Sequence, residues 1–400
     1  MKLKNNNAAT ASSGVPPKAV IVRIAPSPTG NLHVGTARTA LFNFLFAKHN
    51  GGKFLIRIED TDLERSKKEY EKDILEGLEW LGITSDEPVM RQSDRLEIYG
   101  KYAKQLIAKN LASEVDGAVI LKNAQTEISF NDLIRGEIKF EDVPSELVIL
   151  KSDGTPTYNF AVVIDDYEMG ITHVIRGEDH ISNTPRQILV IEALGFNRPQ
   201  YIHIPMILAP DRSKLSKRHG ATSLLEYREK GYLPQAMFNY LALLGWNPGT
   251  EQEIFSMAEL IKVFDIAKIH KGGAIFDEKK LEWVNKQHIN LLSPEEKIKI
   301  IAQEFDVKKI PELDTEKICW KDTSSEETLE HLIESKKIIE NGDDLMPYAE
   351  REGKGNVLWP VRYALSGEEK SPDPFTLIAI LGKDESVKRI EKAIESLSQK

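Results

Sequence analysis

The sequence predicts an α/β domain, interrupted by a small insertion and followed by a long helical region. Three observations predict this fold class. A short β-branched run at residues 19–24 precedes a turn-rich stretch, a helical pattern at residues 34–48 and a second apolar run at residues 53–58. The α/β alternation resumes at Tyr158, after a stretch of different character. From Thr222 onward, apolar residues recur at helical spacing.

The chain begins with a polar segment. Residues 1–18 are polar or small, without the apolar centre of a secretion signal or the arginines of a transit peptide. We expect them to form a disordered tail. The first half of the α/β domain follows at residues 19–110, and its last two expected helices lie at residues 66–81 and 93–110.

Residues 111–157 contain short β-branched runs (AVILK, IKFED, ELVILKS) among turns and charges. This pattern predicts a small α/β insertion that is rich in strands. The second half of the α/β domain spans residues 158–221. We expect strands at residues 172–175 and 201–208 and a helix at residues 183–194.

The helical region divides by composition into residues 222–300 and residues 301–400. The whole chain carries a net charge of −9, and most of that charge falls in residues 301–400. The α/β part is therefore nearly neutral, and the C-terminal part is acidic.

Composition bounds the function. The 400 residues are 41% hydrophobic and 29% charged, which is typical of a globular protein. A net charge of −9 excludes a generally basic nucleic-acid-binding surface, although a local basic groove remains compatible with it. The single cysteine, Cys319, permits neither an intrachain disulfide nor a cysteine-based zinc site, and it favours a reducing compartment. No apolar run reaches the ~18 residues that a membrane span needs.

The first chemistry-bearing string extends from Arg23 to Thr36 (RIAPSPTGNLHVGT), between an expected strand and an expected helix. A helix N-terminus carries unpaired N–H groups and a partial positive charge, so it favours phosphate. His33 can donate a hydrogen bond to a phosphate oxygen, and Gly30 and Gly35 allow a close approach of backbone and ligand. His-x-Gly alone is more often an ordinary turn, but the whole string is far more specific.

Two further strings add charged groups. Residues 214–218 (KLSKR) place two ammonium groups and a guanidinium in a polar loop, which suits a polyphosphate, although such a cluster alone is usually a solvated loop. Residues 57–62 (RIEDTD) place Glu59 at the end of a strand, where open α/β sheets bind ligands. As a lone feature, the other two carboxylates of this string are surface charges.

The last strings are PTYNFA at residues 156–161 and VIRGEDH at residues 174–180. Arg176 follows an apolar strand, where an arginine can bind a carboxylate with two parallel hydrogen bonds. His180 precedes an expected helix and can meet an adenine ring or a phosphate, although a lone histidine here is more often a turn residue.

Taken together, these strings resemble the class I aminoacyl-tRNA synthetases. The first is similar to the family's HIGH element, with His33-Val-Gly-Thr, and the KLSKR string is similar to its KMSKS element. In chain order, R-x-A-P-S-P-T-G, R-I-E-D-T-D, P-T-Y-N-F-A, V-I-R-G-E-D-H and K-L-S-K-R-H-G resemble bacterial glutamyl-tRNA synthetases. The resemblance is dense over residues 20–289 and returns at residues 358–382. It implies a Rossmann-type catalytic domain, with helical stem-contact and anticodon-binding domains at residues 222–300 and 301–400.

The resemblance also implies site residues. The residues that it implies for glutamate are Arg23, Ala25, Ser27, Glu59, Tyr158 and Arg176. The two arginines face the substrate's carboxylates, and Glu59 faces its α-ammonium group. The residues that it implies for ATP are His33, Gly35, His180, Lys214 and Lys217. Of these, His33, Lys214 and Lys217 are the expected catalytic residues.

The resemblance further implies reactants and partners. The expected reaction joins L-glutamate to tRNA(Glu) at the expense of ATP, and Mg²⁺ is held mostly by phosphates and water. No protein metal site and no zinc are expected. The sequence leaves open whether tRNA(Gln) is a further substrate. The family pattern implies a cytoplasmic monomer without a membrane partner.

Two regions depart from the family pattern. The insertion at residues 111–157 is short and lacks the Cys-rich stretch that relatives often carry near its start. The C-terminal region is also compressed. Single-stranded RNA loops can be read by stacking, so Trp320, Trp359, Arg362 and Tyr363 are candidates, although Trp359 and Tyr363 at i, i+4 are more often packed in a core.

Three rival functions remain open. A paralogue that glutamylates a queuosine base of tRNA is disfavoured, because such paralogues end soon after the KLSKR string. Glutaminyl-tRNA synthetase is disfavoured, because its first motif usually has Glu where Ser27 stands. A tRNA-binding protein that has lost catalysis is supported by the short insertion and opposed by the complete set of charged site residues.

Overall fold

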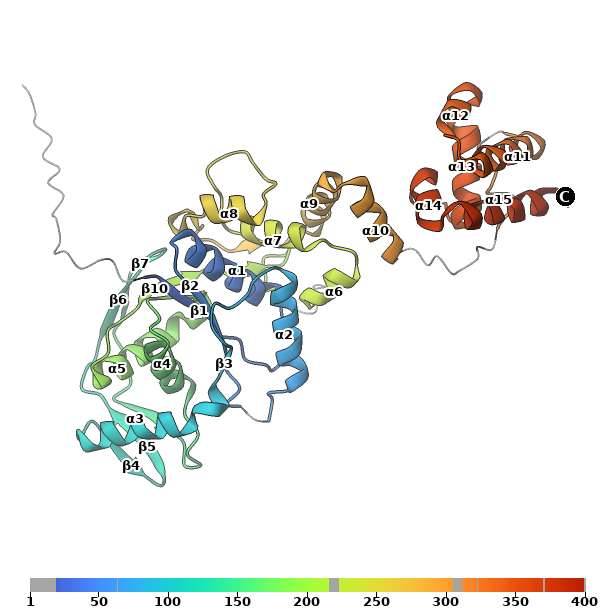
Figure 1. Ribbon diagram of the computed structural model, residues 1–400. Helices are drawn as coiled ribbons and strands as arrows, with labels where there is room; N and C mark the ends of the chain where they lie inside the picture. The colour runs from blue at the N-terminus through green and yellow to red at the C-terminus, as the bar shows by residue number, and fades with distance from the viewer. Residues whose placement is uncertain are drawn as a thin grey trace, which may run out of the picture. The chain divides into compact units, whose positions relative to one another are not determined.

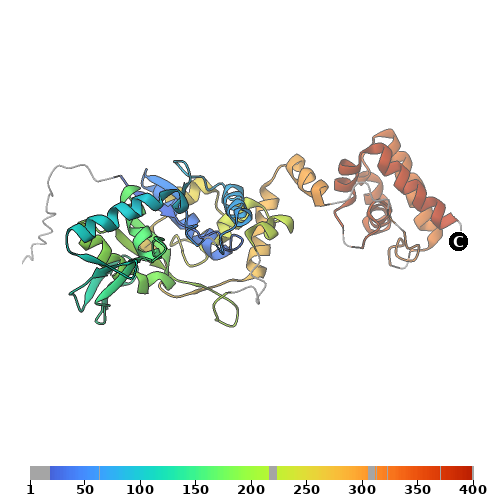
Figure 2. The same ribbon diagram turned by 90° about the horizontal axis from the view of Figure 1, so that it is seen from below.

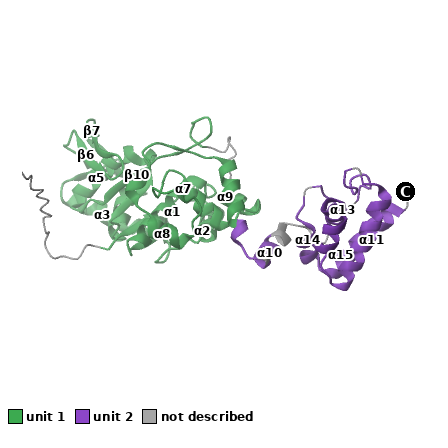
Figure 3. Cartoon of the chain, turned by 90° about the horizontal axis from the view of Figure 1, so that it is seen from above, with its two compact units in different colours: residues 1–288 green, residues 289–400 purple. Residues whose placement is uncertain are grey.

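The computed structural model describes residues 19–62, 64–215, 223–304, 311, 313–321, 323–369 and 371–398. The chain forms two compact units, which meet between His288 and Ile289 (Figure 3). The first contains the α/β fold and the second is helical. None of the helices in the described ranges is long and apolar enough to cross a membrane.

A mostly parallel sheet forms the centre of the first unit. One part has the order β1-β2-β3 and the other the order β7-β6-β10-β9. The strands are β1 (Ile21–Ile24), β2 (Lys53–Ile58), β3 (Met90–Arg91), β6 (Ile128–Asp132), β7 (Gly136–Phe140), β9 (His173–Gly177) and β10 (Gln200–Ile204). Thr172 joins the two parts, because its backbone N–H donates to Ile21 O and its hydroxyl accepts from Ile21 N, each at 2.9 Å. β9 therefore lies beside β1.

Strands β1 and β2 are almost fully buried, as strands covered on both faces must be, and their β-branched residues suit that position. Each nevertheless carries one arginine, Arg23 and Arg57, in its buried run. A charge in such a strand needs partners, and these partners build the site described below.

Helices cover both faces of the sheet (Figure 1). They are α1 (Val34–His49), α2 (Lys68–Trp80), η1 (Gln92–Arg95), α3 (Leu96–Ala108), α4 (Tyr158–Glu168), η2 (Glu178–Asn183) and α5 (Thr184–Leu194). Helix α1 packs on β1, β2 and β9, while α3 lies against α4 and α5 (Figure 2). The apolar cluster between α3, α4, α5 and the strands includes Phe160, Ile164, Ile188 and Tyr201.

The described regular elements of residues 111–157 are all strands, whereas we expected an α/β insertion. Strands β4 (Ala112–Val115), β5 (Ala118–Lys122) and β8 (Glu146–Leu150) form a separate antiparallel sheet. The β6–β7 hairpin instead extends the central sheet, where Leu133 N donates to Tyr201 O at 3.0 Å. The insertion therefore supplies an edge of the central sheet.

The expected strand at residues 201–208 is two strands, β10 and β11 (Ile207–Leu208). Pro205 lies between them and lacks the N–H that a continuous strand needs, while Arg38 of α1 donates to its carbonyl. The rest of the first unit contains α6 (Leu224–Glu229), α7 (Pro234–Leu243), α8 (Met257–Val263), η4 (Ile266–Lys268), β12 (Ala274–Ile275) and α9 (Glu278–Leu291), which ends just beyond the unit's last residue.

The second unit is a helical bundle. Its helices after α9 are α10 (Pro294–Glu304), α11 (Ser325–Asn341), α12 (Met346–Glu352), α13 (Lys354–Ser366), α14 (Pro374–Leu381) and α15 (Lys383–Ser398). Its apolar cluster includes Tyr363. Trp359 is half-buried, and its Nε1 donates to Lys317 O at 3.0 Å. The centroid of its ring lies 5.0 Å from that of the Trp320 ring.

Candidate active site

A cavity of about 620 Å³ lies at the carboxyl ends of β1 and β9. The chain leaves β1 for α1 on one side and β9 for η2 and α5 on the other, so this is the place where the strand order reverses. Open α/β sheets bind ligands in the crevice at such a point. The expected site residues that line the cavity are Arg23, Ala25, Ser27, His33, Gly35, Glu59, Tyr158, Arg176, His180 and Lys214. Lys217 lies outside the described residues.

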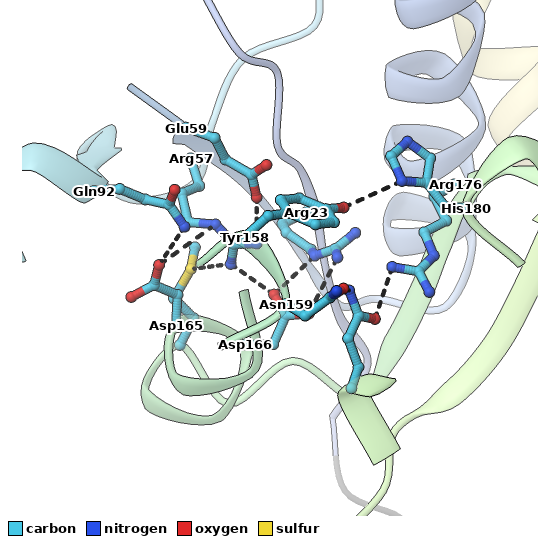
Figure 4. Close-up of polar contacts among 12 residues, drawn as sticks. Arg23, Arg57, Glu59, Gln92, Tyr158, Asn159, Asp165, Asp166, Arg176 and His180 are labelled. Carbon is cyan, nitrogen blue, oxygen red and sulfur yellow. Dashed lines mark hydrogen bonds and ion pairs between the residues drawn. The ribbon is translucent and has the colours of Figure 1, made fainter. Parts of the chain in front are cut away.

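Arg23 reaches the cavity from β1 and is held from below by Asp166 of α4 (Figure 4). Its Nε and Nη2 donate to the two carboxylate oxygens at 2.9 and 3.1 Å. Arg57 of β2 donates to the same carboxylate at 2.6 Å and to Glu59 at 3.0 Å. The Arg57 side chain is 0% exposed. The network therefore connects Arg23 of the first string with Glu59 of the RIEDTD string, and both residues line the cavity.

The charges of this network balance. Burial alone would lower the pKa of Arg57, but Asp166, Glu59 and Asp165 raise it instead. Burial raises the pKa of Glu59, against the opposing effect of Arg57 and Arg23. A cationic group that entered the cavity beside Glu59 would favour its ionised form. Glu59 is therefore suited to an ammonium group.

Arg176 has a different environment. Its Nε donates to His203 Nε2 at 3.1 Å, its Nη1 to Gln187 Oε1 at 2.9 Å and its Nη2 to Thr184 Oγ1 at 2.8 Å. These three partners are uncharged, and burial lowers the pKa of Arg176. A buried guanidinium with neutral partners is a ready binding group for a carboxylate.

His33 caps α1, and its Nδ1 accepts from Gly35 N at 3.1 Å. Since an accepting Nδ1 carries no proton, the neutral ring carries its proton on Nε2 and presents a donor there. A Cβ at Gly35 would meet only His33 Nδ1, at 3.4 Å, and one at Gly30 would meet nothing within 4 Å. The surrounding protein therefore does not demand glycine at either position, and of the two only Gly35 lines the cavity.

Lys214 is exposed, with 63% of its side chain accessible, and its Nζ lies 3.3 Å from Asp179 Oδ2. An exposed pair of this kind contributes little to stability. The ammonium group can therefore leave Asp179 for a phosphate oxygen at small cost.

Tyr158 and His180 meet at the cavity, with 3.2 Å between the tyrosine hydroxyl and His180 Nδ1. Burial raises the pKa of Tyr158 to about 12, so the phenol keeps its proton. Burial and the nearby Arg176 lower the pKa of His180 to about 4. The imidazole is therefore neutral near pH 7 and adds no charge to the site.

The depressed pKa of His180 predicts a loss of stability in mild acid. Between its unfolded value of about 6.5 and its folded value of about 4, the unfolded chain binds the proton and the folded chain does not. The free energy of unfolding therefore falls as the pH falls through this window. We expect His180→Gln to remove part of that fall, as measured by urea unfolding at about pH 7 and pH 5. Equal losses in both proteins would contradict this assignment.

Sequence reasoning missed the residues that hold the two arginines, namely Asp166 for Arg23 and Thr184, Gln187 and His203 for Arg176. It also missed the role of Arg57, which shares Asp166 with Arg23. A usable signal existed, because three of these polar residues interrupt an apolar run: Arg57 in KFLIRI, Asp166 in AVVIDD and His203 in YIHI. Such an interruption predicts a buried polar partner, although it does not say which one.

Comparisons with known proteins identify the family to which the chain belongs. The model of tRNA synthetases class I (E and Q), catalytic domain, matches residues 19–119 and 113–283, and the model of an anticodon binding domain matches residues 286–394. A glutamate--tRNA ligase of Carboxydothermus hydrogenoformans is 41% identical over 474 aligned residues, which cover 93% of this chain and 99% of the relative. Glutamate--tRNA ligase 1 of Rubrobacter xylanophilus is 40% identical over 427 aligned residues, which cover 94% of this chain and 98% of the relative. Both alignments are longer than the chain, so they contain gaps.

A solved structure is also similar. The crystal structure of a glutamate tRNA ligase from Elizabethkingia meningosepticum in complex with its amino acid superposes with a TM-score of 0.74 at 33% identity, covering 95% of this chain and 100% of that one. The match covers both the catalytic fold and the helical C-terminal unit. The chain therefore belongs to the glutamyl-tRNA synthetase family of class I aminoacyl-tRNA synthetases.

Proposed function

We propose that this protein is a glutamate–tRNA ligase, which activates L-glutamate with ATP and transfers it to the 3′ end of tRNA(Glu). The observation that carries this proposal is that two buried arginines, the buried carboxylate of Glu59 and the N-terminus of α1 all line the same cavity. Such a set fits a substrate with two carboxylates, one ammonium group and a polyphosphate co-substrate.

The glutamate pocket consists of Arg23, Ala25, Ser27, Glu59, Tyr158 and Arg176, which all line the cavity. Arg23 and Arg176 bind the substrate's carboxylates, and Glu59 accepts from its ammonium group. The two arginines differ, because Arg23 already holds a carboxylate of the protein and Arg176 holds only neutral groups. An incoming carboxylate is therefore expected to stabilise Arg176 more than it stabilises Arg23.

The ATP site consists of His33, Gly35, His180, Lys214 and Lys217. The backbone N–H groups at the start of α1, the Nε2 proton of His33 and the ammonium of Lys214 suit phosphate oxygens. Within the described ranges, no three His, Cys, Asp or Glu side chains are arranged to hold a metal ion. We propose that phosphates and water hold Mg²⁺, and the proposed reaction does not involve zinc.

The chemistry needs no activated side-chain nucleophile. A carboxylate oxygen of glutamate attacks the α-phosphorus of ATP, the bond to the β-phosphate oxygen breaks, and pyrophosphate leaves with glutamyl-adenylate formed. A hydroxyl of the terminal ribose of tRNA then attacks the carbonyl carbon, and AMP leaves. The protein contributes positioning and stabilisation of the charge that develops on the phosphates.

Lys217→Ala is expected to lower glutamate transfer at least tenfold, or about 1.4 kcal/mol of transition-state stabilisation. The reason is the loss of one cation from the pyrophosphate end of ATP. Transfer of labelled glutamate to tRNA measures the effect. Lys104→Ala, which removes an exposed lysine of α3, is the matched control and should keep the wild-type rate. Unchanged turnover would remove Lys217 from the mechanism.

Arg23→Ala is expected to relax the preference for glutamate over glutamine. An amide leaves a buried guanidinium poorly paired, so the guanidinium rejects glutamine, and alanine removes that penalty. The ratio of kcat/KM for the two amino acids measures the preference. A variant that keeps full discrimination would contradict the assignment of Arg23 to the pocket.

The tRNA contacts follow the domain order. We assign residues 111–157 to the acceptor end, residues 222–300 to the stem and residues 301–400 to the anticodon of tRNA(Glu), with tRNA(Gln) as a further candidate substrate. We further propose that the protein acts as a monomer in the cytoplasm, as the family resemblance implies, and the single cysteine fits a reducing compartment.

The activation step tests the proposal directly. The protein should produce pyrophosphate from ATP over many turnovers when L-glutamate, Mg²⁺ and tRNA(Glu) are supplied, with L-glutamine and L-aspartate as control amino acids. A protein that binds tRNA(Glu) without consuming ATP would be a tRNA-binding paralogue. Glutamate incorporation into tRNA that depends on a queuosine base would establish the modifying activity.

A further inference from the structure

A buried pair, His203 and Asp132, lies beside Arg176 in the sheet. His203 of β10 faces Arg176 of β9 across the parallel ladder, and Asp132 is the last residue of β6 on the far side of β10. His203 Nδ1 and Asp132 Oδ2 are 2.8 Å apart, and both side chains are 0% exposed. The three residues thus form a row across three neighbouring strands, ending at the cavity.

The row fixes the proton positions. Arg176 Nε–H can only donate, so His203 Nε2, 3.1 Å away, must accept and carries no proton. The neutral ring then carries its proton on Nδ1, which donates to Asp132. Burial lowers the pKa of His203, which favours this neutral form.

Asp132 is held as firmly as the histidine. Its Oδ2 also accepts from the backbone N–H of His203 at 2.9 Å, and its Oδ1 accepts from the N–H groups of Ile134 and Arg135, each at 2.9 Å. Burial alone would raise the pKa of Asp132, but these hydrogen bonds lower it. The carboxylate is therefore ionised and immobile.

Two N–H groups of the Arg176 guanidinium have no hydrogen-bond partner among the described residues. Of its five N–H groups, one each on Nε, Nη1 and Nη2 has a partner among the described residues. One N–H on each Nη remains, and Arg176 lines the cavity. Two N–H groups on the two terminal nitrogens match the two oxygens of one carboxylate.

We propose that His203 and Asp132 are positioning residues for Arg176. The neutral His203 ring, oriented by Asp132, holds the guanidinium so that its two remaining N–H groups bind a carboxylate of the amino acid substrate. This assignment rests on the proposed function, because it takes that carboxylate to be glutamate's. It gives the β6–β7 hairpin, which the insertion supplies, a role in the amino acid pocket.

Two substitutions at one position separate positioning from packing. The side-chain carbonyl of His203→Gln can stand where Nε2 accepts from Arg176. The side-chain amide of His203→Asn can replace only the Nδ1 donor to Asp132. We expect His203→Asn to raise the KM for glutamate at least about tenfold, with the KM for ATP changed less than about twofold. His203→Gln should recover most of the wild-type KM for glutamate.

The melting temperatures of the two His203 variants, compared with that of the wild type, show whether either substitution disturbs folding. If His203 had only a structural role, both variants would lose activity in proportion to their loss of stability. The KM values for ATP and for glutamate would then also rise together. Either of these two results would overturn the proposal. Asp132→Asn, which leaves the tautomer of His203 unfixed, should raise the KM for glutamate in the same direction as His203→Asn.

A second readout does not depend on activity. Long-range proton–nitrogen spectra of the histidine-labelled protein should show His203 protonated on Nδ1 and bare on Nε2, with its signals assigned by their loss in His203→Gln. A proton on Nε2 would overturn the proposal even in an active enzyme. A wild-type protein with the expected tautomer that does not activate glutamate would instead refute the proposed function.

Discussion

Arg176→Ala is expected to lower kcat/KM for glutamate by about two to four orders of magnitude. Arg176 is 6% exposed, and the hydrogen-bond partners of its guanidinium among the described residues are neutral, so its charge is available to the substrate. A carboxylate that is buried without its partner costs about 3–5 kcal/mol. Steady-state charging of tRNA(Glu) at varied glutamate measures the loss, and the KM for ATP should stay nearly constant.

Two variants control this prediction. Arg176→Lys keeps the charge but loses the planar arrangement of N–H groups, so it should restore only part of the activity. Arg198→Ala removes an exposed arginine of the same unit, which pairs with Glu192 at the surface, and should leave the kinetics unchanged. An Arg176→Ala enzyme within about threefold of the wild type would show that no substrate carboxylate depends on this residue.

Asp166→Ala is expected to lower the melting temperature of the first unit by about 10 °C. Asp166 holds Arg23 at 2.9 Å and Arg57 at 2.6 Å, and its removal leaves two buried guanidinium groups short of a carboxylate. Breaking such a buried pair costs about 3–5 kcal/mol, which corresponds to about 2–4 °C for each kcal/mol in a unit of this size. The KM for glutamate should rise as well, because Arg23 loses its orientation.

Calorimetry checks this result against a matched control. Asp62→Ala removes another aspartate that pairs with an arginine, Arg65, but the two side chains are 40% and 74% exposed respectively. Exposed pairs contribute little, so this variant should melt at the wild-type temperature. Equal melting temperatures for Asp166→Ala and the wild type would show that the buried network does not stabilise the fold.

The elements that set up the site were predictable from local patterns. β-branched runs located β1 and β2, and the helical spacing from Val34 located α1. Parallel strands bring their carboxyl ends to one edge, so residues after β1, β2 and β9 had to lie near one another. The structure places ten of the expected site residues on one cavity for that reason.

The partners of those residues were not predictable in the same way. Asp166 follows Arg23 by 143 residues and Asp132 precedes His203 by 71, so no local spacing connects them. A buried charge must have a partner, but sequence alone does not choose among many distant candidates. The arrangement of helices on the sheet makes that choice.

The insertion shows a second limit of local reasoning. Its β-branched runs indicated strands, but they could not show that the β6–β7 hairpin joins the central sheet while its neighbours form another. That division depends on the edge of β10, which lies about 70 residues further along the chain. Strand partners are set by tertiary packing more than by the strands themselves.

The central claim is the ligation of glutamate to tRNA, and one assay tests it most directly. Labelled glutamate is supplied with ATP and Mg²⁺ to separate transcripts of tRNA(Glu) and tRNA(Gln), beside a control without tRNA. The account predicts charging of tRNA(Glu), and additional charging of tRNA(Gln) would make the enzyme non-discriminating. Binding of both transcripts with charging of neither would contradict the account and favour a tRNA-binding protein that has lost catalysis.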